Sequence, residues 1–261
     1  MTGATFAARL AWPVEDAVAM TRRNLLHYVR VPQLIVYTVI QPIMFTLLFA
    51  FVFGGAIATP NGNYVNFLIP GIIVQTVVFG AMGTGIKLAE DMQKGIMDRF
   101  RSLPISRSTV LAGRVMTDTI WNTLAILIMA GVGYAIGFRF QGSLLDAFMA
   151  VGLGALFAFA FSWIAASIGM FAKTVQSAEM LGFTWVFPLV FVSSVFVPVQ
   201  TMPDWLEGFA ANNPITLAAN AVRALALGTP IGNDGLLTVA WCLGIIAVFA
   251  PLAVLKFRRL G

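Results

Sequence analysis

The sequence predicts an all-α integral membrane protein with six transmembrane helices. Hydrophobic residues make up 59% of the 261 residues and charged residues only 10%, whereas soluble domains contain roughly 25% charged residues. Apolar runs long enough for a membrane helix, which needs about 20 residues, alternate with short polar segments. The basic residues gather in alternate polar segments, as the positive-inside rule requires. We therefore expect one membrane domain, residues 1–261, without a separate soluble domain.

The segment before the first apolar run, residues 1–30, is expected to form an N-terminal interfacial helix. Its apolar side chains recur on one helical face, with polar side chains opposite. These apolar residues are Val14, Val18, Leu25 and Val29. The pattern predicts a helix that lies along the inner leaflet. An exposed amphipathic helix packed on a partner protein would show the same pattern.

The apolar runs give the positions of the expected spans. Between Val31 and Ile86 there is no charged residue, which leaves room for two spans joined by a turn at Thr59–Asn63. The six expected spans cover about 34–58, 67–86, 118–137, 147–171, 181–199 and 236–255. Each is near the length that the hydrocarbon core of a bilayer requires.

A strongly charged segment, residues 87–114, separates the second and third expected spans. Charged groups of both signs place it in water. Within it, Gly95 and Pro104 bound a short helix candidate. Its apolar face consists of Ile96, Met97, Phe100 and Leu103. The spacing fits a docking helix for a partner protein, and it fits equally an amphipathic turn resting on lipid headgroups.

The segment before the last span, residues 201–235, is too polar to cross hydrocarbon, because a central charge costs about 2.5 to 3.5 kcal/mol on insertion scales. It still reads as two helices, Asp204–Ala211 and Pro214–Leu227. Prolines stand at the start of both, and Gly228 ends the second. We expect two short re-entrant helices that dip into the outer leaflet without crossing.

The distribution of Lys and Arg predicts the orientation. With both termini in the cytoplasm, every one of the 16 basic residues lies inside except Arg139 and Arg223. Such a bias indicates a multi-pass protein of the cell's inner (plasma) membrane. The net charge of +5 is then explained by topology and contact with anionic lipid, and nucleic acid is not expected as a partner.

Several kinds of chemistry have no residues to support them. The expected spans contain no Lys, Arg, Glu or His, and Asp118 at the edge of the third is their only carboxylate. No Walker A loop occurs, and the single His27 and single Cys242 cannot assemble a metal site or a nucleophilic centre. We expect no enzyme activity, metal or cofactor in this chain. Energy for active transport would have to come from outside it.

Four stretches of the sequence are similar to one known family. They are FLIPGIIV (67–74), KGIMDRFRSLPISR (94–107), NPITLAANAVRALALG (213–228) and KFRRLG (256–261). The chain resembles the permease subunits of ABC-2-type exporters, nearest to the daunorubicin/doxorubicin-resistance-type drug exporters. The resemblance implies drug efflux and antibiotic resistance as the role of the complete transporter. It also implies a pair of permeases, homodimer or close paralogues, bound to two copies of a separate ATPase that holds ATP and Mg.

The same resemblance makes the segment 87–114 a cytoplasmic coupling loop whose short helix contacts the ATPase. The implied coupling residues are Gly95, Ile96, Met97, Asp98, Arg99, Phe100, Arg101, Leu103 and Pro104. The apolar ones would fill a groove of the ATPase. The charged ones would fix the register by charge pairing.

Residues on the first two spans are candidates for the substrate path. Tyr37, Gln41 and Phe45 recur every four residues on the first span, and Gln75 and Thr76 lie in the second. They either line a path at the dimer interface or serve interhelical packing. The expected function is outward movement of an amphipathic or lipid-like molecule by alternating access. The alternatives are a self-sufficient secondary carrier or channel, and a membrane assembly protein without transport.

Overall fold

The computed structural model of the protein describes residues 32–57, 59, 63–95 and 107–259. Within these ranges the regular structure is entirely helical. The expected N-terminal interfacial helix and the coupling residues after Gly95 lie outside the described part of the chain. Nothing below refers to their structure.

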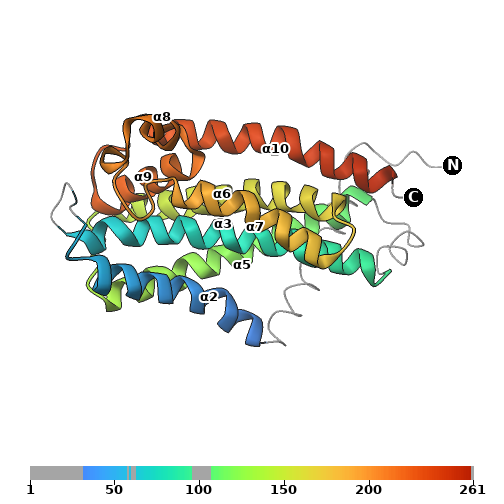
Figure 1. Cartoon of the computed structure of the whole chain (residues 1–261), viewed down its shortest axis with the longest axis horizontal. Coiled ribbons are helices and arrows are strands. Elements are labelled where there is room, and N and C mark those ends of the chain that lie inside the picture. The colour runs from blue at the N-terminus through green and yellow to red at the C-terminus, as the bar shows by residue number, and fades with distance from the viewer. Residues whose placement is uncertain (1–31, 58, 60–62, 96–106, 260–261) are drawn as a thin grey trace, which may run out of the picture.

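Most of the helices run along the long axis of the molecule (Figure 1). They are α2 Pro32–Leu47, the π-helical η1 Leu48–Phe53, α3 Tyr64–Gln93, α5 Arg107–Ala135, α6 Leu144–Phe171, α7 Val175–Phe191, η2 Val199–Thr201, α8 Asp204–Asn212, α9 Pro214–Leu227 and α10 Asp234–Arg259. Among the described residues, α3, α5, α6 and α10 are long and apolar enough to cross a membrane. The expected first and fifth spans correspond to shorter apolar helices.

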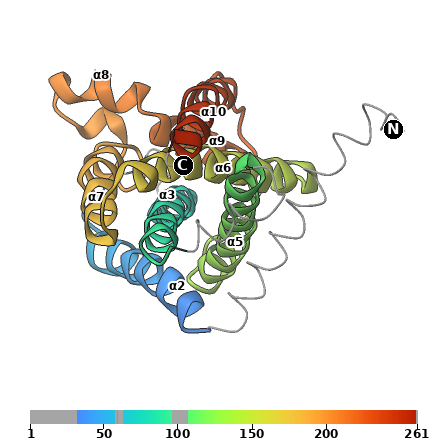
Figure 2. The same ribbon diagram turned by 90° about the vertical axis from the view of Figure 1, so that its right-hand side faces the viewer.

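Helix α3 is the centre of the bundle, with α2, α5, α6 and α7 packed around it, while α10 lies on the far side of α6 (Figure 2). In its most apolar stretch 72% of the residues are buried, against 22% in α10. Glycines allow α3 and α6 to approach closely. A Cβ on Gly85 would lie 2.3 Å from the Ala165 carbonyl oxygen, and a Cβ on Gly169 would lie 2.4 Å from the Gly85 carbonyl oxygen. This crossing fixes α6 against the central helix.

The charged segment 87–114 is more helical than the sequence indicates. Helix α3 continues past the predicted end at Ile86 to Gln93, and α5 already begins at Arg107. The added residues are mainly good helix formers, so the helices extend beyond the apolar spans. Gly95, with φ of 64°, follows the end of α3, and a left-handed glycine is a common helix terminator.

The fifth apolar helix is shorter than expected, because α7 ends at Phe191 instead of reaching Val199. The Asn213 amide donates hydrogen bonds to the carbonyl oxygens of Leu189 and Val192, both at 2.7 Å. These carbonyls at the helix end are therefore satisfied without a further turn. The chain then passes through an irregular stretch, 192–198, before η2.

The two short helices after α7 match the sequence prediction closely. Helix α8 ends one residue later than expected, and α9 has the predicted bounds. The Asn213 side chain accepts a hydrogen bond from the Ile215 amide at 2.9 Å and so caps α9. Gly228 ends α9 with a φ of 65°. Both helices lie at the end of the bundle away from the C-terminus (Figure 1).

Candidate functional site

Four charged side chains join the C-terminal part of α3 to the N-terminal part of α5. We call this group, Lys87, Asp91, Arg114 and Asp118, the coupling base. Lys87 Nζ lies 3.7 Å from Asp118 Oδ1, and Arg114 Nη1 lies 3.4 Å from Asp91 Oδ2. Arg114 Nε lies 3.5 Å from Asp118 Oδ2. Each charged residue on α3 is thus paired with an oppositely charged residue on α5.

The local sequence explains this arrangement. Lys87 and Asp91 are one turn apart on α3, and Arg114 and Asp118 are one turn apart on α5, so each helix presents one cation and one anion on one face. The Asp118 side chain is only 4% exposed and that of Arg114 17%. At such burial the charges are screened less than on an open surface. The coupling base is electrically neutral and holds the two helices together.

An apolar cluster lies against the same end of the bundle and links it to two further helices. Its buried members are Leu88, Leu111, Val115, Trp163, Ala166, Met170, Ala253 and Phe257, from α3, α5, α6 and α10. Burial of large apolar side chains makes such a cluster resist relative sliding of the helices. The cluster therefore ties this end of α3 and α5 to α6 and to the end of α10.

Gly95 is the one predicted coupling residue that the structure describes. It follows Lys94, the C-cap of α3, directly beyond the coupling base. The other eight predicted coupling residues lie outside the described ranges. The position of their contacts stays a prediction.

The candidate path residues of the first expected span lie on α2. Gln41 and Phe45 on α2 are half-buried, and the Phe45 ring packs against three aromatic rings, those of Phe49, Phe191 and Phe196, at centroid distances of 5.9 to 6.4 Å. The side chain of Tyr37 lies outside the described residues.

Gln75 and Thr76 lie inside the subunit instead. Both are 1% exposed, and the Thr76 hydroxyl donates to the Ile72 carbonyl oxygen at 2.7 Å. In this conformation neither side chain reaches a surface that a substrate or a second subunit could contact.

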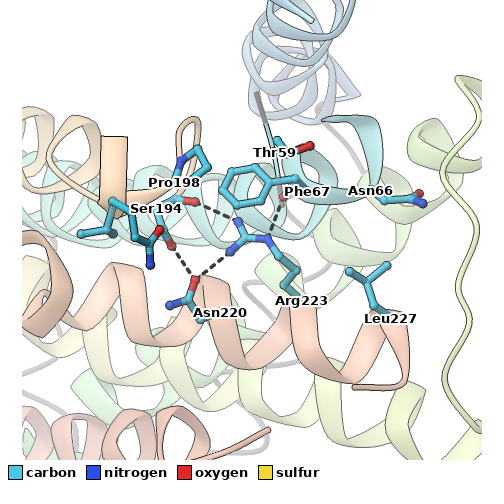
Figure 3. A pocket seen from close by; sticks show the side chains of 10 residues that line it. Thr59, Asn66, Phe67, Ser194, Pro198, Asn220, Arg223 and Leu227 are labelled. Atoms are coloured by element: carbon cyan, nitrogen blue, oxygen red, sulfur yellow. Dashed lines mark hydrogen bonds between the residues drawn. The ribbon is translucent and has the colours of Figure 1, made fainter. Parts of the chain in front are cut away.

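Sequence reasoning missed a buried arginine at the opposite end of the bundle. Arg223 on α9 is only 9% exposed, and Figure 3 shows its guanidinium between α9, the start of α3 and the stretch after α7. Its Nε donates to the Phe67 carbonyl oxygen at 3.0 Å, Nη1 to Asn220 Oδ1 at 2.7 Å and Nη2 to the Ser194 carbonyl oxygen at 2.8 Å. The guanidinium also lies over the Phe67 ring, 3.7 Å from its centroid.

This arginine lines a cavity of about 190 Å³, which we call the arginine pocket. Its lining residues are Thr59, Asn66, Phe67, Ser194, Pro198, Val199, Gln200, Asn220, Arg223 and Leu227. They come from the start of α3 with the turn before it, the stretch after α7, and α9. Only the isolated position of Arg223 among apolar residues could have drawn attention to it in the sequence.

The acceptors of Arg223 are all uncharged. Among the described residues no carboxylate lies within ion-pair distance of it, and none lines the pocket. Burial lowers the pKa of Arg223 to about 9, so the guanidinium remains charged at neutral pH. The described residues also contain no group of His, Cys, Asp and Glu that could hold a metal ion.

Comparison with known proteins gives the family. The model of the ABC-2 type transporter family matches residues 15–227. The chain is 34% identical over 237 residues to the daunorubicin resistance ABC transporter permease protein DrrB1 of Streptomyces coeruleorubidus, covering 91% of this chain and 84% of that protein.

Two further relatives agree. The probable doxorubicin resistance ABC transporter permease protein DrrC of Mycobacterium tuberculosis is 25% identical over 261 residues, 99% of this chain and 93% of that protein. The probable multidrug ABC transporter permease YbhR of Escherichia coli is 25% identical over 207 residues, 77% of this chain and 54% of that protein. The chain therefore belongs to the ABC-2 type transporter family and is the membrane permease subunit of an ABC transporter, whose ATPase is a separate subunit.

Proposed function

We propose that this permease exports an amphipathic drug or lipid-like molecule across the cell membrane. Two of its relatives are named for resistance to daunorubicin and doxorubicin, and a third as a probable multidrug transporter. Drug efflux that confers resistance is accordingly the proposed physiological role. ATP and Mg bind to the partner ATPase and not to this chain.

The coupling base is the observation that carries the mechanism. Residues 94–106 connect α3 to α5, and both of these helices run most of the length of the bundle. In the proposed mechanism the coupling residues Ile96, Met97, Phe100 and Leu103 dock on the ATPase. ATP-driven closure of two ATPase copies moves this loop, and the ion pairs make α3 and α5 follow it as one body.

A second permease subunit completes the proposed transporter. Large apolar side chains remain exposed on η1 and α5, as expected of surfaces that meet lipid or a second subunit. Examples are Phe51, Val52, Ile120, Leu124 and Leu127. We place the substrate path between the subunits, along α2 beside Tyr37, Gln41 and Phe45. Gln75 and Thr76 would line this path only in a conformation that exposes their side of α3.

The proposed topology has six spans with both termini in the cytoplasm. Helices α2 with η1 and α7 would then be the first and fifth spans, beside the four longer apolar helices. Helices α8 and α9 would form the re-entrant region of the outer leaflet. This arrangement places the coupling loop inside the cell, where the ATPase is.

Affinity purification of the full chain from its native membrane in detergent tests the proposal. We expect a soluble ATPase to co-purify in stoichiometric amount, and to be lost when Asp98, Arg99, Phe100 and Arg101 are replaced by alanine. The matched control replaces the acidic residues of α8, Asp204 and Glu207, which leaves the coupling loop intact and should keep the ATPase bound. A chain that purifies alone as a stable oligomer would favour a self-sufficient carrier or channel.

Transport by the reconstituted complex tests the role of single coupling residues. Arg99→Glu or Phe100→Ala should abolish drug transport while the protein is still inserted in the membrane. Full transport by both variants would refute the assignment of the coupling helix.

A further inference from the structure

We propose that the arginine pocket is a binding site for a phosphate group, supplied by the headgroup of a membrane phospholipid. The inference concerns the end of the bundle opposite the coupling base. It does not depend on the identity of the transported molecule.

The first argument is the number of unused hydrogen-bond donors. A guanidinium has five N–H groups, and the described residues supply acceptors for three of those of Arg223. One hydrogen remains on each terminal nitrogen. This pair matches the bidentate arrangement in which arginine binds phosphate. Beside it, Asn220 uses its oxygen to accept from Arg223 and from the Ser194 hydroxyl, which leaves the Asn220 amide nitrogen as a further donor.

The second argument is the uncompensated charge. Burying a cation is unfavourable unless a counter-charge is present. At the coupling base carboxylates meet this need, whereas around Arg223 the described acceptors are two carbonyl oxygens and one amide oxygen. The Phe67 ring contributes its negative face only. An anion entering the pocket would therefore find a cation that is fixed in place by protein hydrogen bonds and still lacks a partner of opposite charge.

The third argument is the size and position of the cavity. At about 190 Å³ it is smaller than the roughly 300 to 1,000 Å³ of pockets that enclose drug-sized ligands. It suits the charged head of a molecule whose remainder lies outside. The pocket is formed where α3 begins and α9 ends, at one end of a bundle of apolar helices (Figure 1). In the proposed topology this end lies at the outer surface of the membrane, in the headgroup region that contains the phospholipid phosphates.

Thermal unfolding of the purified full chain in a neutral detergent tests the proposal. The probes are dihexanoylphosphatidylglycerol, with octyl glucoside as a phosphate-free amphiphile, and sodium phosphate, with sodium chloride at equal ionic strength. At a probe concentration of ten times Kd, binding to the folded state should raise Tm by about 3 °C.

The decisive variant is Asn220→Asp, which places a carboxylate next to Arg223. The new oxygens can still accept from Arg223 and Ser194, so a purely structural role of Arg223 would be preserved. We expect this variant to have a higher Tm than the wild type without ligand and no rise in Tm with phosphate-bearing probes. The control Asn212→Asp makes the same change in charge at an exposed position on α8 and should respond as the wild type does.

Arg223→Lys provides a second variant that keeps the positive charge and loses the fork of donors. It should respond to the probes less than half as strongly as the wild type. A response to the lipid alone, or to lipid and phosphate together, supports the site, and a response to inorganic phosphate alone supports it with the free ion as ligand. No response of the wild type to either probe, or an undiminished response of Asn220→Asp, would overturn the proposal.

Discussion

The two ends of the bundle treat positive charge in opposite ways. At the coupling base, Lys87 and Arg114 are paired with carboxylates on the neighbouring helix. In the arginine pocket, Arg223 is held by neutral oxygens. The first arrangement neutralises the charge and makes a clamp between two helices. The second joins three segments by one side chain and leaves its charge available.

This difference separates two tasks that a transporter must perform. In the proposed mechanism, the end that receives movement from the ATPase needs helices that move together, and ion pairs between helices would provide this. The opposite end needs its short helices α8 and α9 fixed to the long ones, while the charge that fixes them can also bind a ligand. The following predictions test this distinction.

The largest effect is expected from Arg223→Gln. The variant leaves the Phe67 and Ser194 carbonyl oxygens without their buried donor, which should cost about 3 kcal/mol of stability. The matched control is Arg139→Gln, the other arginine predicted outside, which is exposed and should cost at most about 0.5 kcal/mol. Denaturant unfolding in detergent measures both. Equal losses of unfolding free energy in the two variants would mean that the buried hydrogen bonds of Arg223 contribute nothing to stability.

A slightly smaller loss is expected from Gly169→Ala at the crossing of α3 and α6. The new Cβ would lie 2.4 Å from the Gly85 carbonyl oxygen, so the helices must separate, at a cost of about 2 kcal/mol. Gly152→Ala on the same helix meets nothing within 4 Å and should be neutral or stabilising by up to about 0.5 kcal/mol, because alanine favours helix. If both variants have the same free energy of unfolding, the close crossing of α3 and α6 does not stabilise the end of the bundle that holds the coupling base.

The coupling base should show energetic coupling between its charges. Asp118→Asn removes the carboxylate that both Lys87 and Arg114 approach, with an expected loss of about 2 kcal/mol. In a double-mutant cycle with Lys87→Gln, the combined loss should be smaller than the sum by about 1 kcal/mol. Strictly additive losses would show that the two side chains act independently and that no clamp exists.

The smallest effect is expected from Lys94→Gln. Lys94 forms an exposed ion pair with Glu90 within one helix turn. The hydrogen bond that Lys94 donates to the Glu90 carboxylate raises the pKa of Lys94, so its ammonium group stays charged at neutral pH. The pair joins no second helix, and Tm should not change measurably. A clear fall in Tm would show that Lys94 also helps to hold α3 and α5 together, in addition to the four residues of the coupling base.

The sequence predicted those parts of the fold whose signals are local. Pro203 before α8, Pro214 at the start of α9 and Gly228 after α9 predicted the bounds of the two helices nearly to the residue. The end of α3 was placed too early because hydropathy marks where the apolar stretch ends, while a helix of Lys, Glu and Gln continues into water.

The candidate site depended on pairings that no local pattern contains. Lys87 and Asp118 meet because two helices are antiparallel neighbours, and Arg223 bonds to Phe67, which is 156 residues away in the chain. The charge distribution predicts that Arg223, with Arg139, lies on the outer side of the membrane. It could not show that the side chain is buried, since burial follows from the packing of α9 against α3 and the stretch after α7.

The most direct test of the account is the number of drug molecules transported per ATP hydrolysed. It would be measured in proteoliposomes that contain the permease and its ATPase, for the wild type, Asp118→Asn and Arg139→Gln. If the coupling base transmits the movement, Asp118→Asn keeps most of its ATP hydrolysis while transport per ATP falls about tenfold, which corresponds to about 1.4 kcal/mol. Arg139→Gln leaves the ratio unchanged. A wild-type ratio in Asp118→Asn would contradict the central claim that ion pairs between α3 and α5 carry the coupling.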